Sequence, residues 1–159
     1  ARGLIGFSNE FMTETRGTGI LNHSFYEYEF YKGEIPKRSR GSLIAMEQGT
    51  AVAYSLWNLQ DRGVMFIEPG VEVYAGMIVG ENAKDDDLVV NVIKGKKQSN
   101  VRASGSDDAI KLIPPRKMSL EQALEYIEDD ELIEITPLNI RLRKKYLDIN
   151  ERKRQFRQK

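Results

Sequence analysis

The stretch Val64–Asn82, VMFIEPGVEVYAGMIVGEN, decides the fold that the sequence predicts. It consists of short apolar runs that are interrupted twice, at Pro69-Gly70 and at Ala75-Gly76. Short runs of this kind are typical of strands, and turns rich in glycine and proline separate the strands of small barrels and sandwiches. We therefore expect the centre of the chain to form a mostly β domain.

Further elements are predicted on both sides of this stretch. Residues 42–56 contain two apolar runs about a turn at Gln48-Gly49, which predicts a hairpin. Residues 54–63 predict one or two helical turns that end at a glycine. Residues 85–94 predict a turn and a strand, and residues 110–113 are a candidate for renewed strand pairing.

The first residues of the chain predict a separate α/β unit. Residues 3–15 have apolar side chains at helical spacing, and Gly17 or Gly19 suits a left-handed cap at the end of this helix. Residues 20–30 alternate in an aromatic-rich pattern that predicts a strand. The basic connector 31–41 contains proline and glycine, so we place a domain boundary there.

The C-terminal part predicts two helices and two strands. Ser119 and Gln122 form a capping box at the start of the first helix. Strands are predicted on both sides of Pro137, and a polar helix from about Asp148 has no apolar stripe, so it needs a partner to hold it. The apolar face of the first helix is predicted to carry Leu120, Leu124 and Ile127.

Charge is sorted along the chain, although 24 basic and 24 acidic residues give a net charge of zero. Residues 119–135 contain seven acidic residues and no basic one, and residues 141–159 contain nine basic and two acidic residues. Residues 94–106 contain four basic residues and no acidic one. Sorting of this kind suggests a charged partner.

The composition and the motifs of the sequence argue against several kinds of functional site. The absence of cysteine, with His23 as the single histidine, excludes disulfides and a zinc site of ordinary composition, and it fits a reducing cytosol. The lysines after Gly95 lack the G-x-x-x-x-G-K-[ST] spacing of a phosphate loop. No apolar run approaches the ~18–20 residues that span a bilayer. The carboxylates of residues 128–131 are interpreted as a solvated helix end. We expect no catalytic residue, metal or membrane.

The basic loop, Lys94–Ala109 (KGKKQSNVRASGSDDA), is the best candidate for a binding site. A loop of this length with a single large apolar residue, Val101, is usually functional or disordered. Its cations can neutralise phosphates and its polar side chains can position a sugar, which suits shaped RNA. The candidate RNA-binding residues of the loop are Lys94, Lys96, Lys97, Asn100, Arg102 and Ser104. A second set shares one face of a predicted strand and consists of Arg141, Arg143 and Lys145.

Five stretches resemble the TypA/BipA family of bacterial translational GTPases: Arg2–Gly19, Gly33–Gly63, Val73–Asn82, Asp87–Ala109 and Pro114–Pro137. The most specific parts are Asn100–Ala109 and Met118–Pro137. The resemblance covers essentially the whole chain. It implies that residues 1–33 are the last helix and strand of a ferredoxin-type α/β domain like that of elongation factor G. Residues 34–159 would be the family-specific C-terminal domain, β-barrel-like with short helices. The expected fold class is α+β, mostly β.

The resemblance also implies a function. Proteins of the family bind the bacterial ribosome near its A site, and the basic loop matches the loop that reaches toward tRNA there. The expected partners are the 70S ribosome, large-subunit rRNA and A-site tRNA in the cytoplasm, in stress response, ribosome assembly or translation regulation. GTP and magnesium belong to the family's N-terminal GTPase domain. Since the sequence opens ARGLIGF without a methionine, we expect it to be a fragment. Because the resemblance places GTP hydrolysis in a domain that the sequence does not contain, we expect this fragment to be noncatalytic and without a cofactor.

Two other hypotheses and one practical expectation stay open. The acidic helix 119–131 would make the chain a protein-interaction module if it docks a basic ribosomal protein, or it would pack internally against the basic tail. An unrecognised hydrolase would need a cluster of titratable residues, which the sequence does not show. Self-association without a cellular role is expected through apolar residues of 1–33, namely Leu4, Phe7, Phe11, Phe25 and Tyr28.

Overall fold

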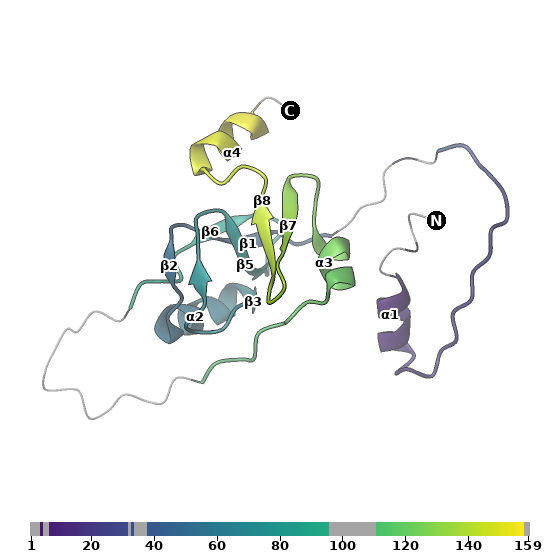
Figure 1. Ribbon diagram of the computed structural model, residues 1–159, viewed down its shortest axis with the longest axis horizontal. Helices are drawn as coiled ribbons and strands as arrows, with labels where there is room; N and C mark the ends of the chain where they lie inside the picture. The colour runs from purple at the N-terminus through teal and green to yellow at the C-terminus, as the bar shows by residue number, and fades with distance from the viewer. Residues whose placement is uncertain (1–3, 5–6, 32, 34–37, 96–110, 158–159) are drawn as a thin grey trace, which may run out of the picture.

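A six-stranded sheet organises the protein in its computed structural model, which describes residues 4, 7–31, 33, 38–95 and 111–157 (Figure 1). The strand order is β6 (Leu88–Val90), β1 (Ser42–Ala45), β5 (Met77–Asn82), β8 (Ile140–Lys144) and β7 (Glu131–Ile135), and β3 (Gly63–Met65) also pairs with β5. Strands β2 (Gly49–Thr50) and β4 (Glu72–Val73) form a separate pair. The α+β, mostly β class is confirmed, but among the described residues the sheet stays open and does not close into a barrel.

Strand β5, the last part of the stretch Val64–Asn82, is the centre of the sheet. One of its edges pairs with β1, and the other pairs first with β8 and then with β3. Its apolar residues are buried because layers of side chains cover both faces, so the strand shows a continuous apolar run. The two predicted interruptions before β5 are confirmed, since Gly70 and Gly76 have positive φ angles of 89° and 85°.

Two hydrophobic cores lie on opposite faces of this sheet. Helix α2 (Ala53–Leu59), which the short 3-10 helix η2 (Gln60–Arg62) directly follows, contributes side chains to one core. Helix α3 (Leu120–Tyr126) contributes side chains to the other. Side chains of β5 alternate between the two cores, because Met77 and Val79 enter the first and Ile78 enters the second. The second core consists of Ile78, Ala123, Tyr126 and Leu142.

The predicted hairpin at Gln48-Gly49 is wrong. Strand β1 pairs in parallel with β6 and antiparallel with β5, whereas β2 pairs with β4. The second apolar run of the predicted hairpin becomes helix α2, which the helical prediction for residues 54–63 anticipated. All four residues of β1 are buried, so this strand needs a central position with a neighbour on each edge, which a two-stranded hairpin does not provide.

The N-terminal residues form the predicted helix but not the predicted strand. Helix α1 spans Phe7–Glu14, and Gly17 caps it with a φ of 76° and a hydrogen bond from its N–H to the carbonyl of Met12. Residues 18–31 are irregular, because no strand of the described chain lies beside them to complete a ladder. Figure 1 shows α1 apart from the sheet.

The apolar side chains of this N-terminal part are exposed, as expected. Phe25 and Tyr28 are 73% and 94% exposed, Leu4 and Phe7 are also exposed, and Phe11 is half-buried. Self-association stays a prediction. The domain boundary between residues 33 and 34 stays a prediction too, because residues 34–37 lie outside the described residues.

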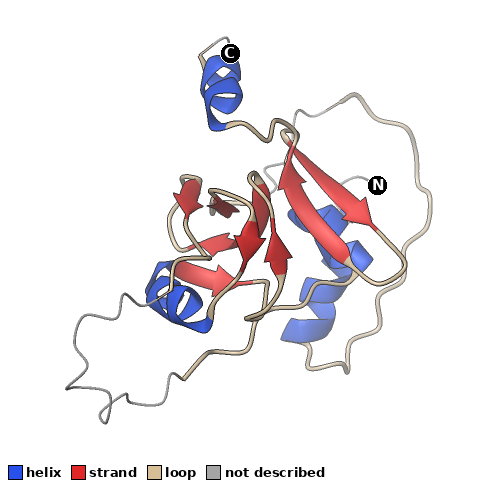
Figure 2. Ribbon diagram, turned by 60° about the vertical axis from the view of Figure 1, so that its left-hand side comes forward, coloured by secondary structure: helices blue, strands red, loops and turns tan. Residues whose placement is uncertain are grey.

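The C-terminal elements follow the predictions except for the buried face of α3 (Figure 2). The capping box of Ser119 and Gln122 is formed, β7 and β8 form a hairpin, and helix α4 (Ile149–Phe156) begins after its N-cap. The predicted apolar face is wrong at Leu124, which is 53% exposed, whereas Ala123 and Tyr126 are buried and the predicted Ile127 packs against the second core. A small alanine allows this short helix to approach the sheet closely. None of the described helices has the length and apolarity needed to cross a membrane.

Candidate nucleic-acid interface

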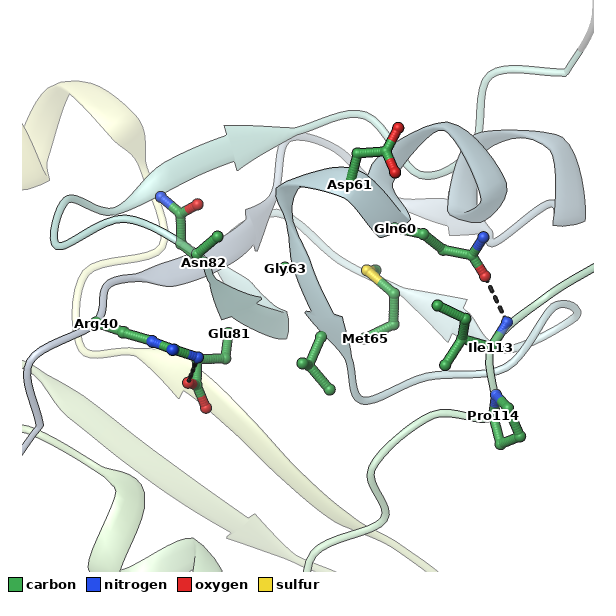
Figure 3. A pocket seen from close by; sticks show the side chains of 11 residues that line it. Arg40, Gln60, Asp61, Gly63, Met65, Glu81, Asn82, Ile113 and Pro114 are labelled. Carbon is green, nitrogen blue, oxygen red and sulfur yellow. Dashed lines mark hydrogen bonds and ion pairs between the residues drawn. The ribbon is translucent and has the colours of Figure 1, made fainter.

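Helix α2 and its extension η2 hold both chain segments that lead into and out of the basic loop. The buried hydroxyl of Ser55 donates a hydrogen bond of 2.5 Å to the carbonyl oxygen of Lys94. On the returning segment, the Gln60 side chain donates to the carbonyl of Lys111 at 3.4 Å and accepts from the N–H of Ile113 at 2.5 Å (Figure 3). The two stems of the loop, residues 91–95 and 111–113, are thus fixed to one helical unit.

The incoming stem has additional hydrogen bonds. The side-chain oxygen of Asn91 accepts from the N–H groups of Ile93 and Lys94, at 3.0 and 3.1 Å, which is a local turn typical of asparagine. The N–H of Val52, just before α2, donates to the carbonyl of Val92. Hence the backbone of Lys94 is fixed, while its side chain is exposed and makes no ion pair with another described residue.

Of the six predicted loop residues, Lys94 is the one that the structure describes. The other five lie outside the described residues: Lys96, Lys97, Asn100, Arg102 and Ser104.

The second predicted set lies at the edge formed by β7 and β8. Arg141 and Arg143 share a face of β8, whereas Lys145 follows the strand, is exposed and has its Nζ 5.9 Å from the ring centroid of Tyr146. The Nε of Arg143 lies 2.7 Å from a carboxylate oxygen of Glu134. Since Glu134 balances its charge, Arg143 is less available to a phosphate than Lys145.

Glu134 also accepts a hydrogen bond of 2.5 Å from the hydroxyl of Tyr74. Burial of Tyr74, followed by this hydrogen bond and the negative charge of Glu134, raises the pKa of the phenol above its ordinary value. The hydroxyl therefore stays protonated at neutral pH and remains a donor to Glu134.

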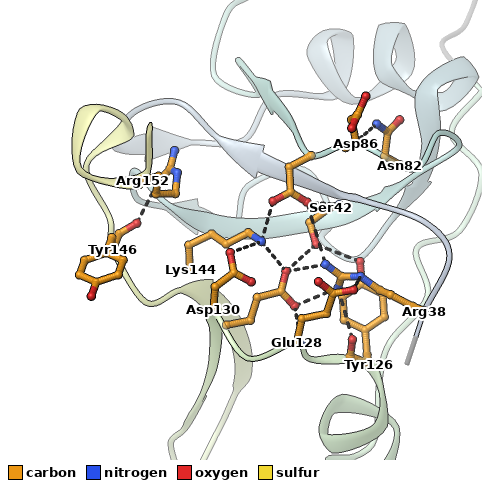
Figure 4. A network of polar contacts seen from close by, with 12 residues as sticks. Arg38, Ser42, Asn82, Asp86, Tyr126, Glu128, Asp130, Lys144, Tyr146 and Arg152 are labelled. Atoms are coloured by element: carbon orange, nitrogen blue, oxygen red, sulfur yellow. Dashed lines mark hydrogen bonds and ion pairs between the residues drawn. The ribbon is translucent and has the colours of Figure 1, made fainter. Parts of the chain in front are cut away.

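A buried network of charged residues, which the sequence interpretation missed, centres on Glu131. Figure 4 labels its members Arg38, Ser42 and Lys144. Arg38 donates to both carboxylate oxygens of Glu131, at 2.6 and 2.9 Å, and Ser42 donates at 3.1 Å. Lys144 lies 2.9 Å from the same carboxylate and 2.6 Å from Asp87. The interpretation of residues 128–131 as a solvated helix end is therefore wrong at this position, because the Glu131 side chain has no exposed surface.

The network determines the protonation states of its members. Burial by itself raises the pKa of Glu131, but the hydrogen bonds from Arg38 and the charge of Lys144 outweigh burial, so this pKa lies below its ordinary value. Burial by itself lowers the pKa of Lys144, and the charge of Glu131 reverses this, so that pKa lies above its ordinary value. Both groups stay ionised at neutral pH.

Several carboxylates of the acidic segment 119–135 thus form ion pairs within the domain. Asp130 pairs with Lys144 at 3.0 Å, Glu128 lies 3.5 Å from Arg38, and Glu134 pairs with Arg143. The contacts with Lys144 and Arg143 support the alternative in which the acidic segment packs against the beginning of the basic C-terminal segment. They leave fewer of its carboxylates for an external partner.

A cleft of about 260 Å³ lies between η2, β3 and β5, but its chemistry does not fit a phosphate (Figure 3). Its charged lining residues are Arg40, Asp61 and Glu81, and both Arg40 and Arg116 pair with Glu81. The arginine of the cleft is thus already neutralised. Within the described ranges, no group of three or more acidic or histidine side chains is arranged to hold a metal ion.

The domain is of the α+β, mostly β class. It has an open mixed sheet with a helix on each face, and one helical unit holds the two stems of the basic loop. Comparison with family models matches residues 40–149 to the TypA/BipA C-terminal domain. The chain belongs to the TypA/BipA family.

Individual relatives agree with this assignment. The chain is 54% identical over 155 residues, 97% of its length, to the large ribosomal subunit assembly factor BipA of Salmonella typhimurium. It is 51% identical over 160 aligned positions, 100% of its length, to the protein of that name from Bacillus subtilis. These alignments cover 26% of each relative, so the chain spans about a quarter of the length of the curated relatives it matches.

Proposed function

We propose that this chain is the ribosome- and RNA-binding C-terminal region of a translational GTPase, and that the basic loop contacts rRNA and tRNA. The observation that carries the proposal is the attachment of both loop stems to α2 and η2, through Ser55 and Gln60. A loop with four cations between rigid stems is suited to polyanion binding. The proposed partners are the 70S ribosome, large-subunit rRNA and A-site tRNA, and the name of the relatives, large ribosomal subunit assembly factor, supports an association with the large subunit.

The mechanism is neutralisation of phosphates by side chains that project from a fixed base. Each phosphate that a lysine or arginine neutralises releases counterions, so binding weakens as salt rises. Contacts of this kind position the RNA backbone and do not select a base sequence. Hydrolysis of GTP, with its magnesium ion, would belong to the part of such proteins that lies outside this chain.

The test is the salt dependence of ribosome co-sedimentation. With four loop cations engaged, log K should fall against log salt with a slope on the order of −3. The variant in which Lys96, Lys97 and Arg102 are replaced by alanine should bind more weakly and show a flatter slope.

A control variant should remove the same charge elsewhere on the surface. The control replaces Arg40, Lys84 and Lys117 by alanine, and all three residues are exposed. We expect the control to keep the slope of the wild type. If the loop variant bound ribosomes like the wild type at every salt concentration, the basic loop would not be the binding site.

A further inference from the structure

Helix α2 presents an exposed tryptophan, with a half-buried tyrosine beside it, on the unit that holds the two loop stems. Trp57, the single tryptophan of the chain, is 46% exposed. Tryptophan is highly buried on average in folded proteins, so this exposure needs an explanation. The ring of Tyr54, one turn earlier on the same helix, lies 6.4 Å away between centroids, with 35° between the ring planes.

Trp57 lies close to the residue that holds the returning stem of the loop. Residues three apart on a helix are neighbours on its surface, so Trp57 lies beside Gln60. Gln60 holds Lys111 and Ile113, and Ser55 on the same helix holds Lys94. The side chains of both lysines are exposed. The exposed ring of Trp57 therefore lies on the side of the helical unit that holds the returning stem, whereas Ser55 and the incoming stem lie on another side.

The surroundings of Trp57 fit a polar ligand better than a protein. The neighbouring positions on the outer surface of the helix are occupied by Asn58 and Asp61, both of them exposed. A docking surface for a protein has a broad apolar centre, whereas the exposed large apolar side chains of this helix and the stems it holds are Trp57 and Ile113. Proteins bind single-stranded nucleic acid by combining aromatic ring faces with cationic side chains, and the helical unit that carries Trp57 also holds the stem with the exposed Lys111.

We propose that Trp57, supported by Tyr54, is a stacking platform for an unpaired base of the RNA whose phosphates the basic loop contacts. The inference rests on the proposed function and makes it more specific: the bound RNA must include a single-stranded nucleotide, because bases within a duplex do not offer their faces. Stacking accepts every base, so the platform adds affinity without strict sequence selection.

The single tryptophan makes the proposal directly measurable, since a base that stacks on the indole quenches its fluorescence. The full chain is titrated with a labelled oligoadenylate of about 12 nucleotides. Label anisotropy reports binding and tryptophan fluorescence reports stacking. We expect quenching that parallels binding. Duplex RNA of equal length and inorganic polyphosphate should bind without comparable quenching.

Variants complete the test, with circular dichroism as the check of folding. Trp57→Leu should weaken oligoadenylate binding roughly ten- to hundredfold, and Trp57→Phe should retain most of the affinity. Asn58→Ala, a neighbouring exposed change, should leave binding unchanged.

The outcomes separate the two proposals. Binding without quenching, quenching by polyphosphate to the same extent, or a Trp57→Leu variant that binds like the wild type would each overturn the stacking platform while leaving loop binding intact. An absence of oligoadenylate, duplex and ribosome binding alike would overturn both.

Discussion

The Nζ atom of Lys144 lies 2.9 Å from Oε1 of Glu131, and this carboxylate has no exposed surface. The pair joins the two strands of the β7–β8 hairpin at their buried end, where Glu131 is the register partner of Lys144. Arg38 reaches the same carboxylate from the segment before β1. A single acidic residue thus connects the β7–β8 hairpin to a segment that lies 93 positions earlier in the chain.

Replacement of Glu131 by glutamine should strongly destabilise the domain. The change leaves the Arg38 and Lys144 cations without their shared buried partner, and the loss of one member of a buried pair costs about 3–5 kcal/mol. Urea unfolding measures the change in the free energy of unfolding. The control is Glu128→Gln, a partly exposed partner of Arg38, for which we expect a cost of about 1 kcal/mol or less. Equal costs for the two variants would contradict the central role of Glu131.

The same carboxylate should make stability depend on pH in the acid range. Because the folded pKa of Glu131 lies below its unfolded value of about 4.3, its contribution is complete above the unfolded pKa. The contribution is lost as the pH falls through the folded pKa. The difference in unfolding free energy between the wild type and Glu131→Gln should therefore be constant from about pH 6 to 7 and shrink in acid. A difference that grows in acid would contradict the lowered pKa.

Gly63 should not tolerate a side chain. A Cβ at this position of β3 would overlap the backbone carbonyl oxygen of Glu81 on β5. Gly63→Ala should cost on the order of 1–3 kcal/mol, because the two strands must separate to accommodate the methyl group. Gly95→Ala is the control, since a Cβ there meets no atom within 4 Å. Thermal unfolding of both variants checks the prediction, which fails if their melting temperatures coincide.

Loss of the Gln60 side chain should loosen the returning stem of the loop. Gln60→Ala removes the acceptor for the Ile113 N–H, and one hydrogen bond contributes about 1 kcal/mol. The amide of Ile113 should therefore exchange with solvent roughly fivefold faster, which NMR measures. In Asn58→Ala, the bond from Asn58 to the Tyr54 carbonyl is lost and exchange at Ile113 should not change.

The exposed aromatics of residues 18–31 should promote self-association. Apolar patches of this kind invite association, so sedimentation velocity should detect dimers or larger species as concentration rises. Replacing Phe25 and Tyr28 by serine should reduce them. Leu138→Ser, an equally exposed apolar position in the β7–β8 turn, should have no such effect. A wild-type chain that stays monomeric at all concentrations would contradict the expectation.

Local patterns predicted the elements whose signals lie within a few residues. The strands around Pro69-Gly70, the capping box at Ser119 and the helix after Asp148 are confirmed, because turns and caps depend on neighbouring side chains. The pairing of β1 with β6 was missed, since parallel pairing joins segments through a long connection that no local pattern records. The strand predicted at residues 20–30 was wrong because a strand depends on its neighbours.

The candidate site was predictable in part. The clustering of cations pointed to the basic loop, and the resemblance to the TypA/BipA family pointed to the same residues. The attachment of its stems to Ser55 and Gln60 was not predictable, since both residues belong to a helix some 35 to 55 positions away in the chain. The burial of Glu131 was missed as well. Its neighbours Asp129 and Asp130 are exposed, and sequence alone does not show which acidic residue of a run faces inward.

Every strand of the described sheet lies before Lys94 or after Lys111, and one helical unit holds the chain at both points. A foreign peptide grafted between these two residues would therefore be presented from a fixed platform, with its two ends held by Ser55 and Gln60.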